Sequence, residues 1–288
     1  MVQIYDRRKG VLTNHEDYQS QKLQVIYSPI LARILLPIVK SSLFSILWTL
    51  PDYLPGSKAK IGRFIKDYQL NPEDFKEKSF KHFAAFFERS YLASSRPVCP
   101  PDCLMAVSDG KLQVYAIDQD LSFKIKERIY LLKDLFTHQL DWSIYQGGYV
   151  FVYRLSMEDG HRYLFAESGL IEKNVTLPGS LHTIRQMGHN HCPVFIENHR
   201  QYIVINNIEM GPIIQMEVGA MTVGKIMNHP LRQAQRGQEK GYFKLGGSSI
   251  IVLYPAGSYK VDEDILKWSK KGFETKVLMG ERIGVKHA

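Results

Sequence analysis

The chain has 288 residues, a hydrophobic content of 44%, a charged content of 23% and a formal net charge of +8. This composition argues against a disordered polypeptide, and no apolar run reaches the roughly 20 residues that a membrane-spanning helix needs. Three cysteines, Cys99, Cys103 and Cys192, do not predict a disulfide framework. The excess of basic residues favours an anionic partner, either nucleic acid or an acidic lipid surface.

Residues 26–50 are rich in Ile, Leu and Phe and include the basic residues Arg33 and Lys40. We expect short amphipathic helices here, broken at Pro37 and stopped near Pro51. Such helices can lie in a bilayer interface with their apolar side down and their basic residues near the lipid headgroups. A pair of core helices is the alternative interpretation.

The next segment also predicts helices. Apolar residues at every third or fourth position indicate a helix over residues 58–70 with one buried face. Asn71 before Pro72 is typical of a helix N-terminus. The phenylalanines of residues 80–87 predict a further helix that packs in the core.

After about residue 104 the pattern changes to short β-branched and aromatic runs between turn residues, which predict strands. The expected strands cover residues 113–117, 149–155, 174–177, 202–205, 213–218 and 250–254. One late helix is expected over residues 262–271, with acids in its first turn and lysines in its last. The sequence therefore predicts an α+β fold, with a helical N-terminal region (1–98) packed on an antiparallel, β-rich catalytic domain (99–288).

The most informative motif is the Gly246-Gly247-Ser248-Ser249 turn, which leads into an apolar strand. Glycines admit strained backbone and a close approach to the carbonyl of Gly247. The Ser248 hydroxyl could attack that carbonyl if a base accepts its proton and donors hold the oxyanion. Taken alone, this motif is more typical of an ordinary turn before a strand.

In context, residues 241–254 resemble the self-cleavage site of the phosphatidylserine decarboxylase family. The resemblance covers roughly residues 25–285, and it is the ordered set of motifs that makes it specific. The further matching segments are 83–89 (FAAFFER), Arg96-Pro97, 217–226 (EVGAMTVGKI), 236–241 (RGQEKG), 262–264, 269–277 (SKKGFETKV) and 279–284 (MGERIG).

This resemblance implies self-cleavage between Gly247 and Ser248 into a β chain, residues 1–247, and an α chain, residues 248–288. Ser248 would become a pyruvoyl group that forms a Schiff base with the substrate amine and accepts electrons when carbon dioxide leaves. The implied reaction converts phosphatidylserine to phosphatidylethanolamine. No separate cofactor and no metal are expected.

Two more motifs match the acid–base residues of the family. Residues 106–110 (AVSDG) resemble S-P-x-D-G, which assigns the catalytic aspartate to Asp109. That carboxylate could orient and charge-stabilise a histidine. Residues 159–164 (DGHRYL) resemble D-Y-H-R-x-H, which assigns the histidine of the decarboxylation step to His161.

The second histidine of that motif, tied in the family to self-cleavage, is replaced by Leu164, which cannot accept a proton. Either His161 serves both steps, another base substitutes, or the chain cleaves poorly. His189 and His191, on an expected surface turn, are spare candidates for the base. Gly160 stands in place of an aromatic residue, and we expect a looser pocket there.

Members of the family act on a phospholipid and sit on membranes through N-terminal helices, so the resemblance implies a peripheral membrane protein on the cytoplasmic face. Its expected partners are the phospholipid membrane and its own two chains, with a homodimer left open. Nucleic acid is disfavoured, because no motif of a known nucleic-acid reader accompanies the charge. The alternatives are a pyruvoyl-dependent decarboxylase of a different amino-acid substrate and an uncleaved lipid-binding pseudoenzyme.

Overall fold

The computed structural model describes residues 2–15, 24–125, 128–136, 140–221, 225–245 and 248–287. Gly246 and Gly247 of the expected cleavage site, and residues 222–224 of the 217–226 motif, lie outside the described residues. The helices are α2 (Pro29–Val39), α3 (Ser42–Thr49), α4 (Ala59–Asp67), α5 (Phe83–Phe87), α6 (Leu132–Leu135), α7 (Gln186–His191), α8 (Val194–Glu197) and α9 (Glu263–Lys270), with short 3₁₀ turns η1 (Leu50–Tyr53), η2 (Pro55–Lys58), η3 (Pro72–Asp74) and η4 (Trp142–Tyr145).

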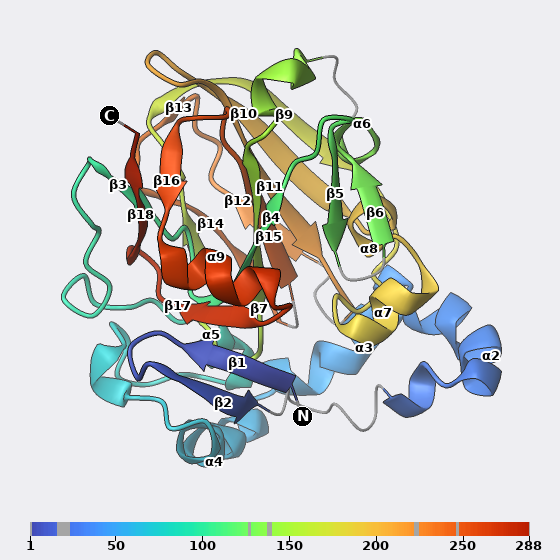
Figure 1. Cartoon of the computed structure of the whole chain (residues 1–288). Helices are drawn as coiled ribbons and strands as arrows, with labels where there is room; N and C mark the ends of the chain where they lie inside the picture. The colour runs from blue at the N-terminus through green and yellow to red at the C-terminus, as the bar shows by residue number, and fades with distance from the viewer. Residues whose placement is uncertain are drawn as a thin grey trace.

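The described residues form one ten-stranded sheet in the order β13-β9-β10-β11-β15-β7-β4-β17-β1-β2, with smaller sheets β12-β14-β8, β16-β18-β3 and β5-β6 (Figure 1). The strands are β1 (Val2–Asp6), β2 (Val11–His15), β3 (Cys103–Met105), β4 (Gly110–Ala116), β5 (Ser122–Ile125), β6 (Arg128–Leu131), β7 (Tyr149–Leu155), β8 (Arg162–Leu164), β9 (Gly169–Leu177), β10 (Arg200–Asn207), β11 (Gly211–Gly219), β12 (Lys225–Asn228), β13 (Gln233–Ala234), β14 (Glu239–Lys244), β15 (Ser248–Leu253), β16 (Tyr259–Val261), β17 (Glu274–Val277) and β18 (Arg282–Lys286). The predicted α+β fold is confirmed, and each predicted strand overlaps an observed one.

The ten-stranded sheet is covered on both faces, and each face has its own hydrophobic core. On one face, Ile250 and Val252 of β15 pack with Tyr163, Ile226 and Phe243 of the sheet β12-β14-β8. On the other face, Ile251 and Leu253 pack with residues of β5, β6, α6 and α8. This alternation is that of a strand buried on both sides, which explains the unbroken apolar run after Ser249.

The first fifteen residues differ from the sequence expectation, because they form strands and not helices. β1 pairs in parallel with β17, and β2 pairs antiparallel with β1, so this hairpin extends the edge of the main sheet (Figure 1). Ile4 and Asp6 are buried, whereas Val2 and Gln3 are exposed. The helical assignment of residues 1–98 is therefore wrong at its start, and the domain division at 98/99 stays a prediction.

The helices of the apolar segment lie where they were expected, but the break is displaced. Pro37 lies inside the last turn of α2, and the chain breaks at Lys40 and Ser41. Pro37 has no N–H and so removes one backbone hydrogen bond from α2, which ends two residues later at Val39. The Ser41 hydroxyl accepts a hydrogen bond from the Phe44 N–H at 3.1 Å and so begins α3. Among the described residues, no helix has both the length and the apolar character to cross a membrane.

The rest of the N-terminal region packs through aromatic side chains. Helix α4 confirms the predicted helix and buries Ile61 and Phe64 against Phe83, Phe86 and other rings of one cluster. The predicted helix start at Asn71 yields only the 3₁₀ turn η3. The cluster formed by Ile61, Phe64, Phe75, Phe83, Ala84, Phe86, Phe87 and Leu245, which we call the aromatic cluster, joins this region to the end of β14.

Candidate active site

Ser248 is the first residue of β15 and is completely buried. It pairs with Gly219 of β11 on one side and with Leu155 of β7 on the other. Because side chains alternate along a strand, Ser248 faces the same side as Ile250, toward the sheet β12-β14-β8. Within the part of the chain that the structure describes, the Ser248 hydroxyl has no hydrogen-bond partner.

A buried hydroxyl without a partner is unusual, because most buried polar atoms are hydrogen-bonded. Gly219 has no side chain, so the residue opposite Ser248 in the ladder adds no bulk beside the hydroxyl. The position therefore has the properties of a reactive group and not of a packing residue.

His161 lies at the start of β8 and is also completely buried. Its backbone carbonyl accepts a hydrogen bond from the Phe243 N–H at 2.9 Å, which ties it to β14 shortly before residues 246–247. Its Nδ1 lies 3.0 Å from the carbonyl oxygen of Asp159. Since a carbonyl only accepts, Nδ1 is the donor in this contact, so Nε2 is the ring nitrogen that can gain or lose a proton.

The aromatic cluster covers both His161 and the approach to the expected cleavage site. The ring of Phe87 lies 3.8 Å from the ring of His161, centroid to centroid. Leu245, the last described residue before Gly246, is buried in the same cluster. His161, Leu245 and Ser248 are thus all buried, and Leu245 and Ser248 are the described residues that flank 246–247 in the sequence.

Asp109 lies beside this group, but its principal partner is an arginine. Arg96 donates to both carboxylate oxygens, at 2.8 and 2.9 Å, and the Met279 N–H donates to Oδ1 at 2.8 Å. Burial alone would raise the pKa of Asp109, but the hydrogen bonds and charge of Arg96 hold that pKa below its usual value. Asp109 is therefore a carboxylate, and Arg96 is a neighbour that carried no role in the sequence interpretation.

Asp109 also reaches the histidine segment through the backbone. The Gly160 N–H points at Asp109 Oδ2 at 3.4 Å, one residue before His161. The looser pocket expected at Gly160 is wrong: a Cβ there would lie 2.5 Å from a ring carbon of Tyr91 and 3.1 Å from Asp109 Oδ2. An aromatic ring from elsewhere in the chain occupies the space, and Arg96 stacks on it at 4.0 Å.

The loop that carries His161 is fixed by a buried charge cluster. The Lys111 ammonium forms ion pairs with the carboxylates of Glu158 and Asp159, the second at 2.6 Å. The Nε2 atom of His15, on β2, lies 3.2 Å from the Glu158 carboxylate. Burial lowers the pKa of Lys111, but the two carboxylates more than compensate, so the net shift is upward. The N-terminal hairpin therefore contacts the loop of the candidate site.

A second buried pair lies in the same layer as Ser248. Lys240 bonds Glu217, and Asn228 donates to Glu217 at 3.1 Å. Burial raises the pKa of Glu217 and lowers the pKa of Lys240, in spite of the attraction between them. Glu217 is opposite Ile250 in the ladder, two residues along from Ser248. Both residues belong to segments that carried the resemblance, but sequence reasoning gave neither a role.

The replaced position lies on the strand that follows His161, whereas the spare histidines have other surroundings. Leu164 is buried on β8, where its N–H donates to the Val107 carbonyl at 2.8 Å. His189 is buried and not on the surface, and its Nδ1 lies 3.1 Å from the Tyr130 hydroxyl, on the other face of the main sheet. His191 lies 3.2 Å from the Tyr27 carbonyl. The surroundings of His189 and His191 give no support for either as the base.

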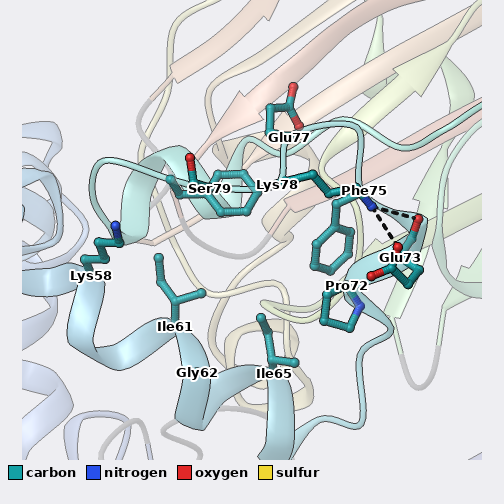
Figure 2. Close-up of a pocket in the computed structure, with 11 residues that line it drawn as sticks. Lys58, Ile61, Gly62, Ile65, Pro72, Glu73, Phe75, Glu77, Lys78 and Ser79 are labelled. Atoms are coloured by element: carbon teal, nitrogen blue, oxygen red, sulfur yellow. Dashed lines mark hydrogen bonds and ion pairs between the residues drawn. The ribbon is translucent and has the colours of Figure 1, made fainter.

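A pocket of about 540 Å³ opens beside α4, at the edge of the aromatic cluster. Ile61, Ile65 and Phe75 line its apolar wall, and Lys58 and Lys78 lie at its rim (Figure 2). None of Ser248, His161 and Asp109 lines it.

Comparison with known proteins identifies the relatives of the chain. A family model described as phosphatidylserine decarboxylase matches residues 83–285. The chain is 36% identical to "Phosphatidylserine decarboxylase proenzyme 2" of Clostridium acetobutylicum, over 98% of both chains. It is 33% identical to the phosphatidylserine decarboxylase proenzyme of Clostridium novyi, over 99% of this chain and 100% of the relative. It is also 33% identical to that of Desulfitobacterium hafniense, over 100% of this chain and 99% of the relative.

Proposed function

The chain belongs to the phosphatidylserine decarboxylase family, and we propose that it is a proenzyme whose mature form converts phosphatidylserine to phosphatidylethanolamine and carbon dioxide. The observation that carries this proposal is the buried hydroxyl of Ser248 at the beginning of β15, which has no hydrogen-bond partner among the described residues. It follows a glycine pair in the sequence, and its ladder partner Gly219 has no side chain.

The surroundings of Ser248 fit a pyruvoyl group made from that residue. Among the described residues the Ser248 hydroxyl makes no hydrogen bond that would be lost when the group forms and Cβ becomes a methyl carbon. When present, the group supplies a ketone that can bind the substrate amine and accept the electron pair released with carbon dioxide.

The remaining residues of the site hold and move protons. We assign to His161 the proton transfer of decarboxylation, because its Nδ1 is held by the Asp159 carbonyl and the Phe87 ring covers its imidazole. Asp109 acts as a permanently charged group beside Gly160, held by Arg96. Its carboxylate positions the backbone that carries His161.

Self-cleavage predicts a fragment pattern that is simple to measure. Purified protein should give two bands on a denaturing gel, and the smaller fragment, residues 248–288, should have 41 residues. Mass spectrometry should find that fragment without a free amino terminus. A single full-length band, with an ordinary serine at position 248, would contradict the proposal.

That contrary result would favour a second candidate function, an uncleaved pseudoenzyme that binds anionic lipid. The observation in its favour is Leu164, a buried aliphatic side chain where the resemblance calls for a histidine. A pyruvoyl-dependent decarboxylase of another amino-acid substrate would instead show two fragments and no carbon dioxide from phosphatidylserine. The gel and the substrate assay together separate the three candidates.

We also propose that the chain binds the cytoplasmic face of a membrane as a peripheral protein, through α2 and α3. These helices expose a row of large apolar side chains, although they belong to a basic protein with a charged surface. The exposed residues are Ile34, Ile38, Leu43, Ile46, Leu47 and Trp48. So many exposed large apolar side chains on two consecutive helices are typical of a lipid or protein contact.

The membrane contact predicts a loss of vesicle binding when the patch is charged. The double variant Ile38→Asp, Leu47→Asp should stay in solution when mixed with vesicles of phosphatidylcholine and phosphatidylserine, whereas the unaltered protein floats with them. The matched control is Ile208→Asp, a fully exposed apolar residue on the turn between β10 and β11. Equal flotation of all three proteins would reject the assignment of α2 and α3.

A further inference from the structure

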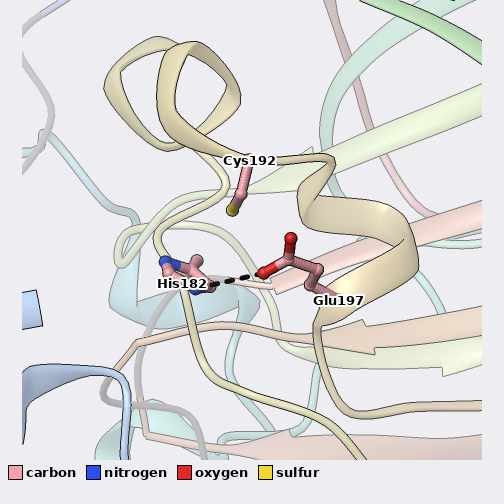
Figure 3. A group of neighbouring side chains, drawn as sticks. All are labelled: His182, Cys192 and Glu197. Atoms are coloured by element: carbon pink, nitrogen blue, oxygen red, sulfur yellow. Dashed lines mark ion pairs between the residues drawn. The ribbon is translucent and has the colours of Figure 1, made fainter. Parts of the chain in front are cut away.

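Three side chains that can bind a metal converge in the segment between β9 and β10, outside the site of Ser248. His182 lies before α7, Cys192 follows α7, and Glu197 ends α8 (Figure 3). Their ligand atoms all lie within 4.8 Å of one another. The Nε2 atom of His182 is 3.6 Å from a carboxylate oxygen of Glu197.

The buried imidazole of His182 indicates that a ligand binds here. The residue is only 5% exposed, and neither ring nitrogen has a hydrogen-bond partner among the described residues. The 3.6 Å separation from Glu197 is too long for a hydrogen bond. Two buried nitrogens without partners are costly, unless another group satisfies one of them.

We propose that His182, Cys192 and Glu197 bind one Zn²⁺ ion. Nitrogen, sulfur and carboxylate oxygen are the donors that zinc uses in proteins, often as three protein ligands with a water in the fourth position. Zinc bonds of about 2.0–2.3 Å place tetrahedral donors roughly 3.3–3.8 Å apart, which matches the histidine–glutamate separation. Rotations that move the other atoms by about 1 Å complete the set.

The charges of the three ligands suit a divalent cation. A thiolate and a carboxylate together balance the two charges of Zn²⁺. The assembled site is therefore neutral and does not repel the positive charge of the nearby Lys40. Cysteine binds Zn²⁺ as the thiolate, so metal binding breaks the S–H bond of Cys192 and releases that proton to solvent.

The ion would fix the segment that supports the strand opposite Ser248. Asn198, next to Glu197, donates to the carbonyl oxygens of both His182 and Gly219, each at 2.8 Å. Gly219 is the ladder partner of Ser248. A zinc ion at Glu197 and His182 would therefore stiffen this connection from one side, without contact with the reacting atoms.

The test uses the full chain, stripped with a chelator and titrated with Zn²⁺ against a zinc indicator, or with Co²⁺ to follow the thiolate charge-transfer absorption. We expect one ion per chain and a cobalt–thiolate band. Cys192→Ser should abolish that band. It should also weaken zinc binding by more than roughly 10–100-fold, which is the loss expected when a residue that only supports a ligand is removed. The matched control is Cys103→Ser, another buried cysteine without a disulfide, which should bind as the unaltered protein does.

The outcomes are separate from those of the decarboxylase proposal, because they need no activity. Circular dichroism shows whether each variant is folded, and His182→Gln provides a second, independent ligand deletion. The proposal fails if the unaltered chain binds less than one Zn²⁺ ion, or if folded Cys192→Ser keeps the cobalt band.

Discussion

Ser248→Ala should abolish both self-cleavage and decarboxylation. The substitution removes only the hydroxyl oxygen, and that atom has no hydrogen-bond partner among the described residues. The fold should therefore survive, because no partner is left unsatisfied and a methyl group suits this apolar layer. We expect a single full-length band and no carbon dioxide released from phosphatidylserine.

The matched control is Ser249→Ala on the same strand. Ser249 is as buried as Ser248, but alternation points its side chain to the opposite face of the sheet. Ser249→Ala should still give two fragments and an active enzyme. If Ser248→Ala releases carbon dioxide, or if Ser249→Ala alone blocks cleavage, the assignment of the reactive hydroxyl is wrong.

The repeating patterns of the sequence predicted the strands and the position of Ser248. The β-branched and aromatic runs and the turn residues between them are local features of the chain, so they can be recognised without tertiary contacts. The late helix was predicted from the acids of its first turn and the lysines of its last, which are also local, and it is observed over Glu263–Lys270. The N-terminal hairpin was missed, although Ile4 and Asp6 alternate with exposed residues, because five residues are a short signal.

The partners of the site residues could not be predicted in the same way. Asp109 matched a motif, but Arg96 as its ion-pair partner depends on how a loop thirteen residues earlier folds back. Gly160 suggested space, yet Tyr91 fills it from a distant part of the chain. The pair Glu217–Lys240 joins two strands of different sheets. Such contacts arise only when the layers pack.

These contacts show how the N-terminal region contributes to the site. Phe87 covers His161, Arg96 holds Asp109, and Tyr91 fills the space at Gly160, so three residues of one segment contact the histidine loop and the aspartate. The same region continues from the apolar helices α2 and α3, which we propose contact lipid. The residues that cover the candidate active site and the helices that we propose contact the membrane are therefore close in sequence.

If another base exists, His161→Ala should still give self-cleavage products, and if none exists it should remain uncleaved. In both cases the substitution should stop decarboxylation. Loss of a positioned acid–base group typically costs 10²–10⁴-fold in rate. We therefore expect turnover of phosphatidylserine to fall by about that factor, measured on whatever fraction of the protein is cleaved. The measurement pairs a denaturing gel with carbon dioxide release.

The two readouts decide which interpretation of Leu164 is correct. If His161→Ala remains uncleaved, His161 serves both steps, because Leu164 offers no proton acceptor. If it cleaves but does not turn over, a different base matures the protein, and Glu217 is the buried candidate on the face of Ser248. His229→Ala, a half-exposed histidine paired with Glu239, should change neither readout. Full decarboxylation by His161→Ala would remove His161 from the site, since no proton transfer could then depend on it.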